Sequence, residues 1–165
     1  MFKIGEVVIY PGYGLCKIIS IDEKFIEGKS IQAYVLKLLD GEAEIYVPID
    51  SVKKSGLRAI VAKEDLKEIY KILSQREVKI TNGNWNKRYK EYTEKLKRGD
   101  AFILASLVKE LYELSKRKTL SFGERKVFER AKELLVLELS FCENCSPEEI
   151  ENKLQEILNS QEEIF

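Results

Sequence analysis

The fold of the N-terminal part is decided by the stretch AYVLKLLDGEAEIYV, which runs from Ala33 to Val47. Its two halves are rich in β-branched and aromatic residues, and the pair Asp40-Gly41 between them is a strong hairpin signal. In the second half, polar and apolar residues alternate from Glu42 onward, so one face of this segment is apolar. The stretch therefore predicts an antiparallel hairpin that buries one face.

Short strands also precede this hairpin. Residues 7–10 and 14–21 are rich in β-branched and aromatic residues, and the turn formers Pro11-Gly12-Tyr13-Gly14 separate them. A second turn, Glu27-Gly28-Lys29, lies before the hairpin. Short, closely spaced strands of this kind predict a small twisted antiparallel β-barrel of the Tudor or SH3-like type, a class that binds partners and rarely catalyses reactions.

From Lys63 the apolar spacing changes to that of helices. Asn84 and Asp100 are expected to cap two helices, Gly99 ends the first of them, and Ser121 has the capping-box spacing to Glu124. A further short acidic helix is expected to begin near residue 146. The fold class is thus α+β, with a barrel in residues 1–58 and an all-α helical bundle in residues 63–160 that includes an acidic C-terminal tail. The join is expected near residues 56–63.

Charge is segregated along the chain, although the 28 basic and 28 acidic side chains give a formal net charge of zero. Residues 61–132 hold 19 basic and 11 acidic side chains, whereas residues 133–165 hold 1 basic and 9 acidic ones. Such a basic block favours a polyanionic partner for the middle of the chain. A solvated helical surface without a partner is the alternative interpretation.

Several function classes are disfavoured. The chain has no histidine and no glycine-rich phosphate loop that leads into a helix, so we expect no enzyme, no cofactor and no metal. Cys142 and Cys145 have the spacing of a redox pair or half a zinc site, but they follow a long helix and precede a capping residue, which favours ordinary helix-end cysteines. Without a membrane span or a signal peptide, we expect a cytoplasmic protein, and we expect a monomer.

The single tryptophan, Trp85, lies at the start of a predicted basic helix, directly after the turn formers of residues 82–84. Periodicity leaves two interpretations open, because Trp85 begins a stripe with Tyr89, Tyr92 and Leu96 that could be wholly buried. The position at a helix start, where free N–H groups can receive a phosphate, favours an exposed wedge for nucleic acid. A second basic segment lies within residues 116–126 and contains Lys116, Arg117, Lys118, Arg125 and Lys126.

Two separate segments resemble the CarD/CdnL family of bacterial transcription regulators. Residues 2–14, FKIGEVVIYPGYG, are similar to the opening of the family's Tudor-like module, which transcription-repair coupling factors share. Residues 84–90, NWNKRYK, look like the family's tryptophan-basic signature, and residues 120–126, LSFGERK, look like its second basic helix start. The resemblance covers roughly residues 1–140, and the helical part excludes coupling factors.

This resemblance implies a factor that binds the β1 lobe of the RNA polymerase β subunit through its barrel and promoter DNA through its helices. Trp85 would insert in the minor groove at the upstream edge of the transcription bubble and so stabilise the open complex. The implied DNA-binding residues are Trp85, Lys87, Arg88, Arg125 and Lys126, and Lys90 belongs to the same basic segment. The implied polymerase-binding residues are Lys24, Tyr46 and Pro48.

One position departs from some relatives, which carry an arginine where this chain has Tyr46. An ion pair is lost there, although strand addition would still bind through main-chain hydrogen bonds. A protein-interaction adaptor without DNA binding is the alternative function.

Overall fold

The structure is a computed structural model that describes residues 2–160, and it divides into an N-terminal unit, residues 1–60, and a helical unit, residues 61–165. Among the described residues, no helix has the length and apolar content needed to cross a membrane.

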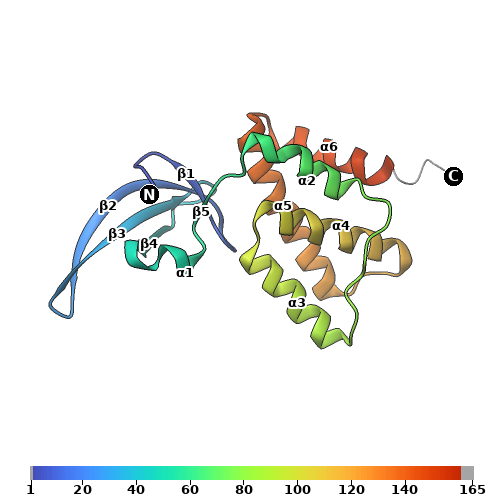
Figure 1. Ribbon diagram of the computed structural model, residues 1–165, viewed down its shortest axis with the longest axis horizontal. Helices are drawn as coiled ribbons and strands as arrows, with labels where there is room; N and C mark the ends of the chain where they lie inside the picture. The colour runs from blue at the N-terminus through green and yellow to red at the C-terminus, as the bar shows by residue number, and fades with distance from the viewer. Residues whose placement is uncertain (1, 161–165) are drawn as a thin grey trace. The chain divides into compact units, whose positions relative to one another are not determined.

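The N-terminal unit is one antiparallel sheet in the order β4-β3-β2-β1-β5 (Figure 1). Its strands are β1 Val7–Tyr10, β2 Gly14–Ile26, β3 Lys29–Leu38, β4 Glu44–Pro48 and β5 Arg58–Ala59. The two hairpins expected from the sequence are confirmed, and β2 and β3 extend farther toward their common turn than expected. The sheet has five strands, as a small barrel would. Within residues 2–160, however, β4 and β5 do not pair with each other, so the sheet is open.

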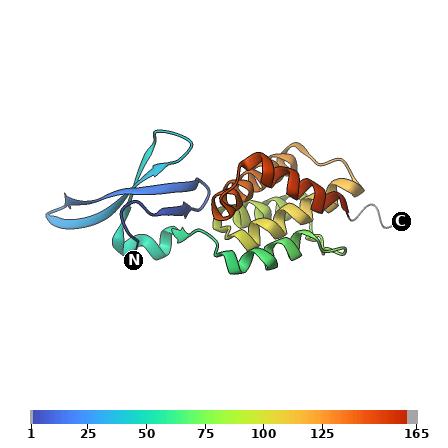
Figure 2. The ribbon, with the colours of Figure 1, turned by 90° about the horizontal axis from the view of Figure 1, so that it is seen from above.

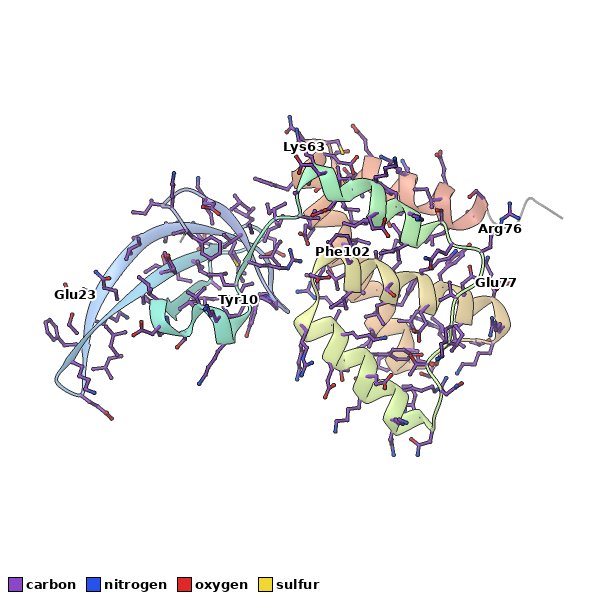
Figure 3. All side chains as sticks on the ribbon, in the orientation of Figure 1. Tyr10, Glu23, Lys63, Arg76, Glu77 and Phe102 are labelled. Carbon is purple, nitrogen blue, oxygen red and sulfur yellow. The ribbon has the colours of Figure 1, made fainter. Side chains whose placement is uncertain are left out.

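The β2–β3 hairpin is the longest part of this sheet, and Glu23 lies toward its outer end (Figure 3). The register shifts between Ile18 and Ser20, a bulge that increases the local twist and lets the two strands curve. Side chains on one face pack into a small core of Val8, Cys16, Ile18, Tyr34, Leu36, Val47 and Leu57. The alternation read from the second half of the hairpin is thereby confirmed, because Val47 is buried and Tyr46 is exposed.

Two elements of this unit were not predicted. A short helical segment, η1 Ile49–Ser51 followed by α1 Val52–Ser55, ends at Gly56 in the left-handed conformation (φ 76°). A Cβ on Gly56 would lie 3.0 Å from Pro11 Cγ, so both backbone conformation and space favour glycine here. The strand β5 has only two residues, too few for a periodic pattern, and its pairing with β1 comes from tertiary contact.

The helical unit contains the five longer helices that the sequence predicts, after a short turn, η2 Lys63–Asp65 (Figures 1 and 2). They are α2 Leu66–Leu73, α3 Trp85–Arg98, α4 Ala101–Arg117, α5 Phe122–Glu143 and α6 Pro147–Asn159. The expected caps are confirmed: Asn84, Asp100 and Ser121 each accept a backbone N–H three residues later. Gly99 ends α3, and Asn144 in the left-handed conformation ends α5.

The acidic C-terminal region is an integral part of the bundle. Helix α6 packs against both α5 and α2. Its buried side chains, Ile150, Leu154 and Leu158, belong to the main core of the unit. The acidic residues of α6 therefore lie on a helix that apolar contacts hold in the bundle. Up to residue 160, this acidic region is part of the folded unit.

We predict that Leu154→Ala destabilises the helical unit by about 2 to 5 kcal/mol, because the substitution leaves a cavity in a core position. Urea unfolding followed by circular dichroism measures the change. The matched control is Asn152→Ala on the exposed face of α6, which should change the free energy of unfolding by less than about 0.5 kcal/mol. Equal stability of the Leu154 variant and the parent would show that α6 is dispensable to the core.

Candidate functional site

The starts of α3 and α5 come together in the helical unit, where the two helices are in contact. At the start of α3, Asn84 Oδ1 accepts the Lys87 N–H at 2.9 Å. At the start of α5, Ser121 Oγ accepts the Glu124 N–H at 3.2 Å, and Glu124 Oε1 accepts the Ser121 N–H at 2.9 Å. This reciprocal pair is the capping box that the sequence predicts. Both basic segments therefore begin at ordered helix starts.

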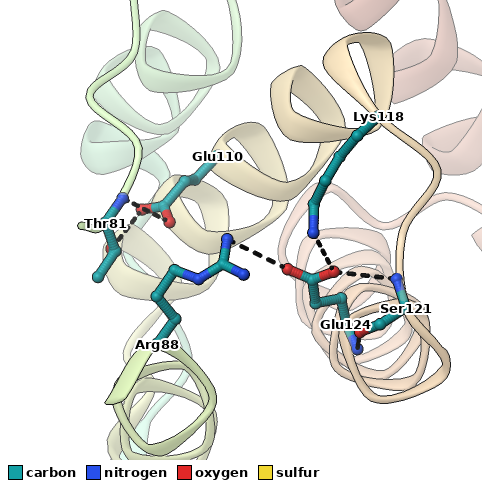
Figure 4. A network of polar contacts seen from close by, with 6 residues as sticks. All are labelled: Thr81, Arg88, Glu110, Lys118, Ser121 and Glu124. Atoms are coloured by element: carbon teal, nitrogen blue, oxygen red, sulfur yellow. Dashed lines mark hydrogen bonds and ion pairs between the residues drawn. The ribbon is translucent and has the colours of Figure 1, made fainter. Parts of the chain in front are cut away.

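Glu124 also joins the two helix starts through its charge (Figure 4). Its side chain is fully buried, Oε1 lies 3.1 Å from Lys118 Nζ, and Oε2 lies 3.6 Å from Arg88 Nη1. Burial acts to raise the pKa of this carboxyl, but the hydrogen bonds from Ser121 and Lys118 outweigh it and hold the pKa below its usual value. Glu124 is thus a buried carboxylate that favours its charged form.

A second buried carboxylate, Glu110 of α4, anchors the connection before α3 (Figure 4). It accepts hydrogen bonds from the backbone N–H and from the hydroxyl of Thr81, both at 3.2 Å, and it lies 4.0 Å from Lys95 Nζ. Burial and the nearby Glu110 raise the pKa of Tyr92, the buried aromatic of α3, above its ordinary value. The irregular connection from α2 to α3, which includes Arg76 and Glu77 (Figure 3), is therefore held in place near its end.

Trp85 is neither buried in the core nor free in solvent. Its side chain is 40% exposed, and its ring lies 5.1 Å from that of Tyr89, centroid to centroid, at an angle of 38°. A Cβ on Gly123 would lie 3.0 Å from Trp85 Cη2 and 3.1 Å from Tyr89 Cε2. Because Gly123 has no side chain, both rings can rest on the first turn of α5. Of the two interpretations that periodicity leaves open, the structure favours a positioned, partly exposed indole.

The basic residues predicted to contact DNA fall into two groups. The side chains of Lys87, Lys90, Arg125 and Lys126 are exposed on the first turns of α3 and α5. We call these four the basic rim. Arg88 differs, since its side chain is only 18% exposed and its guanidinium faces the buried Glu124. The structure thus assigns Arg88 a contact within the fold that the sequence pattern did not indicate.

Phe122 is an exposed aromatic residue that sequence reasoning did not select as a site residue. It is the first residue of α5 and is 74% exposed, while Lys126 Nζ lies 4.7 Å from its ring centroid. We call Trp85, Tyr89 and Phe122 the aromatic patch. Sequence reasoning passed over it because phenylalanine is among the residues most often buried, and a core role is the default interpretation.

The cysteines near the end of α5 serve the fold. Cys142 is buried, its Sγ lies 3.2 Å from the Val61 carbonyl oxygen, and burial raises its pKa. The Val61 N–H in turn donates to the buried Glu138 at 2.9 Å. Within residues 2–160 there is no group of three or more cysteine, aspartate or glutamate side chains that could hold a metal ion.

In the N-terminal unit, Lys24, Tyr46 and Pro48 lie on one face of the sheet. Tyr46 and Pro48 are two residues apart on β4 and pair with Val35 and Ala33 of β3. Lys24 of β2 reaches across this face, so that its Nζ lies 3.6 Å from the Tyr46 ring centroid. Tyr46 thus binds a cation of its own chain through its ring.

The strand β4 is an edge of the sheet, since β3 is the one strand that pairs with it among the described residues. Its outer side therefore presents main-chain N–H and C=O groups that could receive another strand. Lys24 and Tyr46 lie on the face adjoining this edge.

We predict that Glu124→Gln lowers the free energy of unfolding at pH 7 by about 1 to 3 kcal/mol, because buried charged hydrogen bonds are weakened. A carboxyl with a lowered pKa contributes stability above its usual pKa and loses it as the pH falls through the lowered value. The difference between variant and parent should therefore shrink as the pH falls below the usual range for a glutamate carboxyl. Urea unfolding at several pH values measures this difference in the free energy of unfolding. A difference that does not change with pH would contradict the conclusion that the charged form of Glu124 stabilises the fold.

Gly123→Ala provides a separate test of how Trp85 is positioned. Alanine suits a helix better than glycine by about 1 kcal/mol, so the helix itself should tolerate the change. The added Cβ must displace the indole, and we expect altered Trp85 fluorescence with higher accessibility to a neutral quencher. Trp85 is the single tryptophan of the chain, so the emission reports on this site alone. An unchanged spectrum would show that the indole does not rest on Gly123.

Comparison with known proteins agrees with both parts of this description. The family described as the CarD-like/TRCF RID domain matches residues 2–61, and the family described as the CarD C-terminal domain matches residues 68–155. The second match extends beyond residue 140 and covers most of α6. The chain is 31% identical over 153 residues to the putative transcription factor YdeB of Bacillus subtilis (strain 168), which covers 92% of this chain and 99% of that protein. The chain therefore belongs to the CarD/CdnL family of transcription regulators.

Proposed function

We propose that this protein is a transcription regulator that binds the β subunit of RNA polymerase, at its β1 lobe, through the N-terminal unit, and promoter DNA through the helical unit. The observation that carries the DNA part is a partly exposed indole where two helix starts meet, together with four exposed cations on the first turns of those helices. Family membership supports the polymerase part, because the N-terminal match is to the domain shared with coupling factors. The family is one of transcription factors and not of enzymes.

Trp85 is proposed to act as a wedge in the minor groove at the upstream edge of the transcription bubble. Insertion between base pairs costs a few kcal/mol per unstacked step, so the indole must be held firmly while part of it remains accessible. Contacts with Tyr89 and Gly123 support its position, and its 40% exposure leaves area for a base step. A wedge bound at this edge would favour the open promoter complex.

The basic rim is proposed to contact phosphates on either side of the wedge. Each phosphate neutralised contributes about 0.9 to the slope of log affinity against log salt for duplex DNA, so a few contacts give weak, salt-sensitive binding. Contacts of this kind carry no sequence information by themselves. Arg88 is proposed to contribute mainly by holding Glu124 and the two helix starts, because its guanidinium faces inward.

Lys24, Tyr46 and Pro48 are proposed to contact polymerase together with the edge of β4. Main-chain hydrogen bonds to an added strand would provide affinity, and the side chains on the adjoining face would provide specificity. The Lys24 ammonium above the Tyr46 ring orders both side chains before binding.

The two interfaces are proposed to act together. Once polymerase holds the N-terminal unit near the promoter, the effective concentration of the helical unit at the DNA is high, and weak DNA binding becomes useful. An adaptor that binds polymerase without DNA is the alternative. The exposed basic rim favours DNA over this alternative, because clustered cations of one sign attract a polyanion.

We predict that Trp85→Ala leaves co-purification with RNA polymerase unchanged and shortens the lifetime of heparin-challenged open complexes about tenfold or more, since a loss of about 1.4 kcal/mol corresponds to tenfold. Lys24→Glu combined with Tyr46→Ala should instead reduce co-purification. Charge reversal at Lys87, Arg125 and Lys126 should also shorten the lifetime.

Three outcomes would contradict the proposal. The adaptor would tolerate charge reversal of the basic rim without a change in open-complex lifetime. Full polymerase binding by the Lys24 and Tyr46 double variant would exclude the proposed face of the sheet. An unfolded Trp85→Ala protein, seen by circular dichroism, would show that the indole is a core residue.

A further inference from the structure

Phe122 is exposed in a way that the fold does not require. It is 74% exposed at the first position of α5, whereas Phe128 on the same helix packs against the core. The capping box at this helix start uses Ser121 and Glu124, and Phe122 takes no part in it. A large apolar side chain in water carries a solvation cost that a polar residue at this position would avoid.

The surroundings of Phe122 are basic and aromatic. Lys126 Nζ lies 4.7 Å from its ring centroid, and Arg125 is exposed one turn into the same helix. The next residue, Gly123, is the one on which Trp85 and Tyr89 rest. Phe122 therefore directly precedes the glycine on which the indole rests, and Lys126 of the basic rim lies over the Phe122 ring.

We infer that Phe122 is a second base-contacting residue, which stacks on an unpaired base next to the duplex step that Trp85 opens. The ligand of the aromatic patch is then DNA with unpaired bases at the end of a duplex. This inference rests on the proposed function and adds to it a residue and a preferred DNA form. Aromatic side chains stack on any exposed base, so the contact requires no particular sequence.

The charge around the ring supports nucleic acid as the partner. An apolar protein surface docked on Phe122 would remove the nearby Lys126 and Arg125 from water without compensation, which is costly. DNA provides a phosphate for each cation and a flat apolar base for the ring. A fully paired duplex offers the phosphates but keeps its base faces stacked, so the ring gains its contact where pairing is interrupted.

The test compares the full-length protein and Phe122→Ala on two fluorescein-labelled DNAs of one sequence, a paired duplex and the same duplex with a short unpaired bubble. At low salt, anisotropy should show bubble DNA bound roughly fivefold to roughly a hundredfold more weakly by the variant, the range expected for loss of one base–aromatic contact. Binding to the paired duplex should change little. A 2-aminopurine in the bubble should be quenched by the parent and less by the variant.

Phe141→Ala is the matched control, because Phe141 is also exposed, at 48%, near the opposite end of α5. It should bind both DNAs as the parent does, and Phe122→Trp should retain the preference for the bubble. Circular dichroism of each variant checks folding, which alanine at an exposed helix position should preserve.

Two results would overturn the inference. In the first, Phe122→Ala binds bubble DNA as tightly as the parent, whereas Trp85→Ala binds it more weakly. This result would exclude Phe122 from the interface and leave the proposed function intact. Equal weakening of both DNAs by Phe122→Ala would show that the residue contributes general affinity without preference for unpaired bases. By contrast, the proposed function itself would be rejected if Trp85→Ala and the charge-reversed variant of the basic rim both bound DNA as tightly as the parent.

Discussion

The candidate DNA site depends on one buried carboxylate, Glu124. It closes the capping box with Ser121, accepts a hydrogen bond from Lys118 and faces Arg88 across the junction of α3 and α5. A buried charge is tolerated when it is paired and hydrogen-bonded, and the lowered pKa shows that these contacts outweigh desolvation. Glu124 thus caps α5 and ties it to α3 through Arg88, close to where Trp85 lies over Gly123.

This constraint also explains why the cations near Trp85 differ in role. Arg88 is drawn toward the buried carboxylate, whereas the four residues of the basic rim remain exposed for a partner. Two aromatic rings held against Gly123, on helix starts that carry exposed cations, would suit DNA whose stacking is interrupted. Rigid support matters for a wedge, because side-chain freedom lost on binding would reduce the small free energy that a single ring contributes.

The N-terminal unit provides a different kind of surface. Its sheet ends at β4, an edge with main-chain groups available for pairing, and the adjoining face carries Tyr46 with the Lys24 ammonium over its ring. Under the proposed function, strand addition would provide affinity for polymerase and these ordered side chains would provide specificity.

The sequence by itself determined the α+β fold class, the hairpins and the caps at Asn84, Asp100 and Ser121, because alternation, helical periodicity and turn chemistry are local properties. It also indicated where the basic helix starts lie. Only the tertiary structure decided the exposure of Trp85 and Phe122, the inward direction of Arg88, the pairing of β5 and the place of α6 in the core. Each of these depends on residues distant in the chain, such as Gly123 beneath Trp85 and Glu124 opposite Arg88, and no local pattern records which distant residues will meet.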